Sequence, residues 1–191
     1  EDCELADPGA VGLGSGLVTG GKLLYGATGF AGELGHVVVD PEGRQCGCGK
    51  KGCLETYASA TGIRRTVQVL LAERNEPSPL RGLGFPELTS KRIFEAARDG
   101  DPIALAAFDR TARILGMKLA DAVAHTSPEA IFLAGGLAAA GHVLFEPTRR
   151  YLEAFLFGMY AGTVQLLPSR LEPGNSAILG AAALIWDELG S

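Results

Sequence analysis

The chain has 191 residues, of which 47% are hydrophobic and 20% charged, and its net charge at pH 7 is −5. A domain of this size removes about 70% of its unfolded surface from water, so we expect one compact domain. The negative charge and the lack of a long basic run argue against a nucleic-acid-binding face. No apolar run reaches the roughly 18 residues of a membrane-spanning helix, and the N-terminal residues EDCELADPG lack signal-peptide character. We therefore expect a cytoplasmic protein that contacts neither nucleic acid nor membrane.

Residues 10–28, AVGLGSGLVTGGKLLYGAT, predict a glycine-rich β-hairpin that turns near Gly20. Closely spaced glycines let backbone N–H groups approach a phosphate. The residues in question are Gly12, Gly14, Ser15 and Gly16. The alternative is a hairpin without a ligand, because such hairpins are common.

The next segment, residues 29–55, concentrates side chains that bind metals. It contains His36, Cys46, Cys48 and Cys53. Three cysteines and one histidine form one of the closed ligand sets of structural zinc. The alternative is a disulfide beside a buried histidine, but three clustered cysteines cannot all pair locally, and Cys46 and Cys48 are too near in sequence to bridge easily. We predict zinc, which leaves Cys3 as a free thiol and fits a reducing compartment.

Two carboxylates flank this loop: Glu33 lies three residues before His36, and Glu55 lies two residues after Cys53. A metal that joins the ends of the loop would let both acids face one space. His36 could bind the metal through one ring nitrogen and offer the other to a ligand rich in hydroxyl groups. The alternative is that Glu33 caps a turn and Glu55 is an ordinary acid at the start of a helix.

Helical spacing of apolar residues predicts a helix over 54–73, broken near Gly62, and two more over 89–97 and 101–124. A connector rich in proline and glycine separates the first two, over residues 75–86. We assign these helices to the core scaffold.

Residues 130–134, AIFLA, predict a buried parallel strand that ends in Gly135-Gly136. A strand that leads into two glycines and a helix can form a backbone-lined pocket, or a tight turn with no ligand. Further elements are expected at 147–157 (helix), 163–167 (strand) and 175–189 (helix). In the last, the small residues Gly180 to Ala183 predict tight packing on neighbours.

The motifs E-x-G-H at 33–36 and C-x-C-G-x-x-G-C-x-E at 46–55 resemble the signature of the ROK family, which comprises bacterial sugar kinases and sugar-responsive repressors. The resemblance runs from about Gly9 to Ala183. It implies an α/β chain that forms the second lobe of a two-lobed, actin-like (ribonuclease H-like) ATPase fold. It also implies structural zinc on His36, Cys46, Cys48 and Cys53, and sugar contacts from Glu33, His36 and Glu55.

The same resemblance implies a nucleotide site made of two segments. Phosphate would lie against Gly12, Gly14, Ser15 and Gly16, and adenosine near Gly135, Gly136 and Leu137. The chain departs from the family pattern at Val11 and Ser15, where threonine and glycine are usual.

In the family, the first phosphate loop (D-x-G-G-T) and the catalytic aspartate (within N-D-A-N) precede the hairpin. Here only 11 residues precede Gly12, and Asp2 and Asp7 lie too close to the hairpin to act as the base. We therefore assign no catalytic base and expect the first lobe to lie outside this chain.

The resemblance implies ATP-dependent phosphorylation of a hexose, with glucose expected, by a complete enzyme that uses Mg²⁺ and ATP. The isolated chain is expected to be inactive. An alternative is the sugar-sensing lobe of a repressor, and a weaker one is a zinc-stabilised interaction module. Related kinases imply a homodimer, for which the apolar run 152–160 could supply the contact, although it could equally be core.

Overall fold

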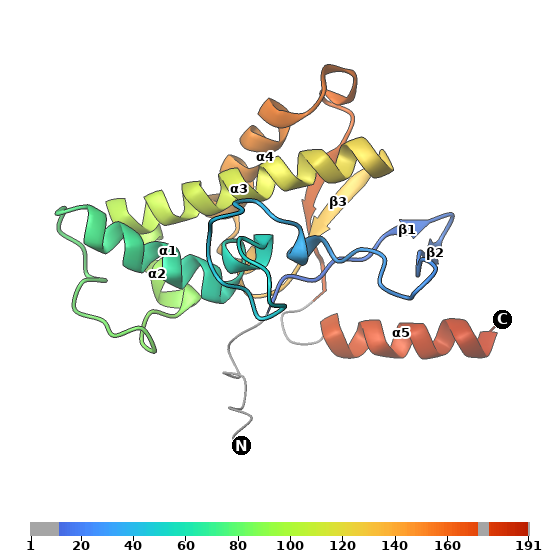
Figure 1. Ribbon diagram of the computed structural model, residues 1–191, viewed down its shortest axis with the longest axis horizontal. Helices are drawn as coiled ribbons and strands as arrows, with labels where there is room; N and C mark the ends of the chain where they lie inside the picture. The colour runs from blue at the N-terminus through green and yellow to red at the C-terminus, as the bar shows by residue number, and fades with distance from the viewer. Residues whose placement is uncertain (1–11, 172–175, 191) are drawn as a thin grey trace.

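The structure is a computed structural model that describes residues 12–171 and 176–190 (Figure 1). Four residues named above lie outside the described residues: Asp2, Cys3, Asp7 and Val11. The helices are α1 (Ala60–Glu73), α2 (Ser90–Arg98), α3 (Pro102–Thr126), α4 (His142–Phe155) and α5 (Ser176–Gly190). The strands are β1 (Val18–Thr19), β2 (Lys22–Leu23), β3 (Ala130–Leu133) and β4 (Gln165–Pro168). Short 3-10 turns cover Leu34–His36, Leu54–Thr56, Ala138–Ala140 and Gly158–Tyr160.

The long helix α3 is the centre of the core. One end packs against α1, α2 and the start of α4, and the other end packs against α4, β4 and the turn at Leu54 (Figure 1). Asp101 caps this helix by accepting a hydrogen bond from the backbone N–H of Ala104 at 2.7 Å, and Pro102 follows at the first helical position. Phe108 at its middle is 1% exposed. Within the described residues, no helix has the length and apolar character needed to cross a bilayer.

Two small sheets confirm an α/β chain. In the first, β1 and β2 pair antiparallel as the predicted hairpin, with Val18 opposite Leu23. In the second, β3 and β4 run parallel, with Ala130 opposite Gln165. The chain between β3 and β4 includes α4, which packs against α3 rather than standing free.

The predicted break near Gly62 was wrong. The chain forms a 3-10 turn over Leu54–Thr56, and α1 begins at Ala60, so Gly62 lies inside the helix. Ser59 sets this start, because its side chain accepts a hydrogen bond from the N–H of Gly62 at 3.0 Å. The break therefore falls before the serine cap.

The start of the helix expected over 147–157 was also wrong, because α4 begins at His142 and contains Pro147 in its interior. Proline removes one backbone donor, but this position is near enough to the helix start for the other hydrogen bonds to form. The other predicted helices and β4 are present, with ends that differ by a few residues.

Two packing predictions failed. The strand β3 is only half-buried, and Phe132 on its outer face is 65% exposed. In α5, residues 180–183 are exposed, and Ile178 and Trp186 are 70% and 80% exposed. In Figure 1, α5 extends below the hairpin and away from α3. Both surfaces are apolar and lack a covering layer among the described residues.

Candidate metal and sugar site

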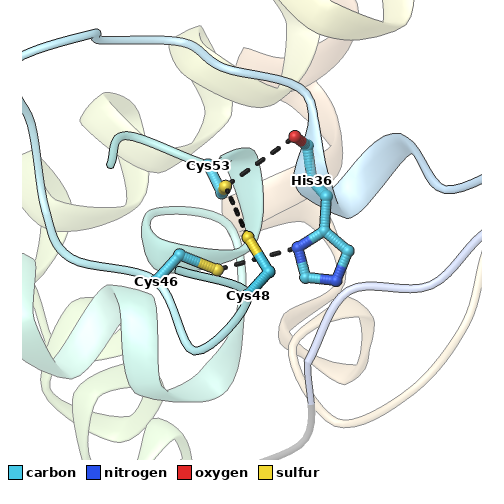
Figure 2. Close-up of side chains that lie close together, drawn as sticks. All are labelled: His36, Cys46, Cys48 and Cys53. Atoms are coloured by element: carbon cyan, nitrogen blue, oxygen red, sulfur yellow. Dashed lines mark hydrogen bonds between the residues drawn. The ribbon is translucent and has the colours of Figure 1, made fainter. Parts of the chain in front are cut away.

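The four predicted metal ligands converge (Figure 2). Their ligand atoms all lie within 4.8 Å of one another. The Sγ atoms of Cys48 and Cys53 are 3.6 Å apart, and Cys46 Sγ lies 3.6 Å from His36 Nδ1. Zn–S bonds of about 2.3 Å in a tetrahedron would separate the ligand atoms by about 3.7 Å. The cluster has the composition and spacing to hold a metal ion. All three cysteines are free, so the disulfide alternative is not found.

The loop has little regular structure to hold it in place. Its backbone pairs at two isolated bridges, Val38 with Cys53 and Gln45 with Lys51. Arg44 ties the loop to α1 and to the turn before it. Its guanidinium donates to the carbonyls of Thr56 at 2.7 Å and Gly62 at 2.9 Å, and to Thr66 Oγ1 at 3.0 Å. It also stacks 4.4 Å from the centroid of the Tyr57 ring.

The three thiols differ in acidity. Burial, with a hydrogen bond to Glu55, raises the pKa of Cys46 to about 12. Burial also raises the pKa of Cys53. A backbone hydrogen bond from Lys50 is the main cause that lowers the pKa of the exposed Cys48 to about 7. Because metals bind thiolates, Cys46 and Cys53 must lose protons when a metal enters.

The structure also brings together the three predicted sugar-binding residues. His36 Nε2 lies 3.9 Å from Glu33 Oε2, and His36 Nδ1 lies 3.6 Å from Glu55 Oε1. The side chain of Glu33 is 58% exposed, and that of Glu55 is 21% exposed. Glu33 precedes the 3-10 turn at Leu34–His36, but its side chain makes no capping hydrogen bond. The capping alternative for Glu33 is therefore not supported.

The glycine-rich hairpin lies directly against this group. A Cβ atom at Gly12 would lie 2.7 Å from Glu55 Oε2, and a Cβ atom at Gly35 would overlap the carbonyl oxygen of Leu13. Gly14 and Gly16 remain exposed along the same segment, which precedes β1, and the Ser15 hydroxyl donates to the carbonyl of Gly32. The predicted phosphate segment and the predicted sugar residues therefore adjoin, a relationship that the sequence did not predict.

The second predicted nucleotide segment follows β3. Gly135 and Gly136 are exposed, and Gly135 has φ +89°, a conformation that favours glycine. Leu137 is partly buried against the core around α3. This strand-to-turn geometry is as expected, while the nucleotide contact itself stays a prediction.

Sequence reasoning missed a cavity of about 230 Å³ beside Glu55. Its lining includes Ser59, Thr61 and Arg65 from the start of α1. Only the serine cap gave a signal in the sequence, because the other two residues resemble ordinary helix residues.

Comparison with known proteins identifies the family. A family model described as the ROK family matches residues 10–188. The chain belongs to the ROK family. It is 39% identical over 180 residues to a glucokinase of Thermotoga maritima, covering 94% of this chain and 56% of the relative. The ROK chain thus spans about half the length of the curated relatives that it matches.

Solved structures of ROK proteins share the fold. A glucokinase from Streptomyces griseus, in complex with glucose and AMPPNP, aligns with a TM-score of 0.80 at 36% identity, over 91% of this chain and 57% of that one. A ROK transcriptional regulator, a homologue of the Escherichia coli MLC protein, aligns with a TM-score of 0.77 at 35% identity, over 91% and 43% of the two chains. The chain therefore has the α/β fold of the ROK sugar kinases.

Proposed function

We propose that this chain is the second lobe of an ATP-dependent hexose kinase whose substrate is glucose. The observation that supports this most directly is the convergence of Glu33, His36 and Glu55 on one side of a Cys3His cluster. The relatives named glucokinase, and the glucose and AMPPNP in the Streptomyces griseus structure, support the same assignment.

In this proposal the metal is zinc, held by His36, Cys46, Cys48 and Cys53. Zinc would supply structural rigidity to a loop that has little regular secondary structure. His36 would bind it through Nδ1, which faces Cys46 Sγ, and leave Nε2 facing Glu33. The imidazole and the two carboxylates would then orient sugar hydroxyls as a fixed set of donors and acceptors.

In the reaction, a sugar hydroxyl oxygen forms a bond to the γ-phosphorus of ATP as the bond from that phosphorus to the bridging oxygen of ADP breaks. The hydroxyl proton goes to a carboxylate, which we place in a first lobe outside this chain. The backbone of Gly12, Gly14, Ser15 and Gly16 would contact the phosphates, with Mg²⁺ bound to ATP. Gly135, Gly136 and Leu137 would lie near the adenosine.

The exposed apolar surfaces support the presence of a further lobe. Phe132 on β3 and Ile178, Ile185 and Trp186 on α5 are between 59% and 80% exposed. Large exposed apolar surfaces often mark contact sites. We propose that the first lobe covers α5.

For assembly we propose a homodimer. Within the apolar run 152–160, Leu152 is buried, but Phe155 is 42% exposed and Phe157 and Met159 are each 69% exposed. This part of the run is surface rather than core, so it can supply a contact. Sedimentation of the chain as a monomer at micromolar concentration would reject this assembly.

The proposed sugar site is tested by calorimetry of glucose binding to the zinc-loaded chain. Glu55→Gln should weaken binding by tenfold or more and keep the zinc, while Glu76→Gln, in the exposed connector, should bind as the unmodified chain does. The chain alone should not phosphorylate glucose. Turnover by the isolated chain would contradict our placement of the base.

The second candidate is the sugar-sensing lobe of a ROK repressor, favoured by the likeness to the MLC homologue. The kinase lobe and the repressor lobe differ in whether they bind ATP. Saturable binding of AMPPNP that weakens when Gly14→Val blocks the hairpin supports the kinase, and sugar binding without nucleotide binding supports the repressor.

A further inference from the structure

The carboxylate of Glu55 lies at the edge of the cavity, and neighbouring residues hold it in position. Glu55 Oε1 lies 3.6 Å from His36 Nδ1, and Oε2 lies against the backbone of Gly12. Glu55 belongs to the turn at Leu54–Thr56, directly before α1. Because both oxygens are positioned, the carboxylate presents a fixed acceptor to whatever fills the cavity.

The rest of the lining supplies donors, and Arg65 is the main one. Among the described residues it makes one hydrogen bond, a long one from Nη1 to the carbonyl of Gln45 at 3.4 Å. No ion pair to Arg65 occurs within residues 12–171 or the described part of α5. A guanidinium group has several N–H donors in a planar fork, so most of them remain available to a ligand.

Two hydroxyl groups add to this surface. Ser59 is 7% exposed, and its oxygen accepts from Gly62 N, which leaves the hydroxyl hydrogen without an acceptor in the described part of the chain. Thr61 Oγ1 is buried and has no hydrogen-bond partner among the same residues. Polar groups buried without partners are uncommon in folded proteins, and they often mark a place where a ligand or water completes the set.

We infer that this cavity is part of the sugar site, and that Arg65 donates a hydrogen bond to one sugar hydroxyl. The inference rests on the proposed sugar-binding function. A hydroxyl group both donates and accepts, so a carboxylate that only accepts and a guanidinium that only donates match its two capacities. An anionic ligand fits less well, because the Glu55 carboxylate lines the same cavity.

The test is a set of NMR titrations of the zinc-loaded 191-residue chain with glucose and its monodeoxy analogues. In Arg65→Met, glucose should bind about tenfold more weakly, the loss typical of one charge-assisted hydrogen bond. The loss of affinity from glucose to one deoxy analogue should be about tenfold smaller in Arg65→Met than in the unmodified chain. The losses for the other analogues should be the same in both proteins. Arg92→Met is the control, because Arg92 on α2 lies outside the cavity and pairs loosely with Glu87 at 3.9 Å.

The possible results distinguish a failure of the Arg65 contact from a failure of the proposed sugar-binding function. Equal weakening of all analogues, or no change in Arg65→Met, overturns the Arg65 contact and leaves the sugar function standing. Inorganic phosphate binding that depends on Arg65, without an effect on glucose, overturns it in favour of an anion site. If the unmodified chain binds no sugar, both the function and the inference are wrong.

Discussion

Gly35 lies so close to Leu13 that a Cβ atom on Gly35 would overlap the carbonyl oxygen of Leu13. Gly35 is buried between Glu33 and His36, the two residues of its turn that we assign to sugar binding. Leu13 belongs to the segment before β1 that we assign to phosphate binding. The turn and the hairpin are therefore one packed unit, and a change in their spacing moves both proposed sites.

This contact predicts the effect of Gly35→Ala. The added methyl group must push the turn from the hairpin, which we expect to cost about 1–3 kcal/mol of folding free energy. Glucose should bind at least tenfold more weakly, because Glu33 and His36 move. Thermal unfolding and calorimetry measure both effects. Gly82→Ala is the control, since its Cβ would meet nothing within 4 Å. Equal melting temperatures for the two variants would show that the close approach is not present in solution.

Cys48 offers a test of the metal that does not disturb packing. It is exposed, whereas Cys46 and Cys53 are buried, so Cys48→Ala removes a ligand and leaves no cavity. We expect zinc to fall from one equivalent to less than about a tenth, and amides of residues 36–53 to exchange faster, because binding energy on the order of 10 kcal/mol is lost from the loop. Elemental analysis and hydrogen exchange report these changes. Glu55→Gln should keep its zinc. Absence of stoichiometric zinc in the unmodified chain would refute the zinc proposal.

Zinc affinity should depend steeply on pH. Burial raises the pKa of Cys46 to about 12 and also raises that of Cys53, so both are protonated thiols at neutral pH. Cys48, with its pKa lowered to about 7, is a thiolate above that pH. Binding above pH 7 therefore releases two protons, and the dissociation constant should fall about a hundredfold per pH unit. Below pH 7 a third proton makes the dependence steeper. Competition with a chromophoric chelator between pH 6.5 and 8.5 measures the slope, and a flat profile would contradict the raised pKa values.

The sequence predicted the convergence of the candidate metal ligands better than it predicted the packing. The hypothesis of one shared metal requires His36, Cys46, Cys48 and Cys53 to lie close together, as they do, and this constrains their positions without knowledge of the core. Local signals also placed α3, because Asp101 and Pro102 are strong helix-start residues. Contacts between distant segments, such as Gly12 with Glu55, have no comparable local signal.

The failed packing predictions have a common physical cause. The pattern AIFLA predicts a buried strand and the small residues of α5 predict tight packing on neighbours, but apolar composition does not identify which neighbour buries a surface. Phe132 and Trp186 are exposed because no described layer covers them. Composition predicted burial, but it could not identify which segment would bury these surfaces.

Arg44 is expected to be the main link between the metal loop and α1. Arg44→Met would remove the guanidinium hydrogen bonds to the carbonyls of Thr56 and Gly62, and we expect a loss of about 2–4 kcal/mol in folding free energy. Burial lowers the pKa of Arg44 to about 10, so it stays cationic at neutral pH and its bonds persist there. Denaturant unfolding measures the loss. Arg92→Met, which removes an exposed side chain, should change stability by less than about 0.5 kcal/mol. A similar small change in Arg44→Met would show that Arg44 is not the main link.

The last prediction concerns α5. Trp186 is the one tryptophan of the chain and is 80% exposed, so its fluorescence reports this helix alone. In the 191-residue chain we expect emission typical of indole in water and ready quenching by iodide. In a longer polypeptide that includes the proposed first lobe, emission should move to shorter wavelength and quenching should decrease. Ile185→Asp sharpens the test: because Ile185 is 59% exposed, the change should alter the stability of the isolated chain by less than about 0.5 kcal/mol. In the longer polypeptide it should cost about 2 kcal/mol or more, because a charge would be buried at the contact. Equal, small effects in both proteins would mean that α5 does not dock on the first lobe.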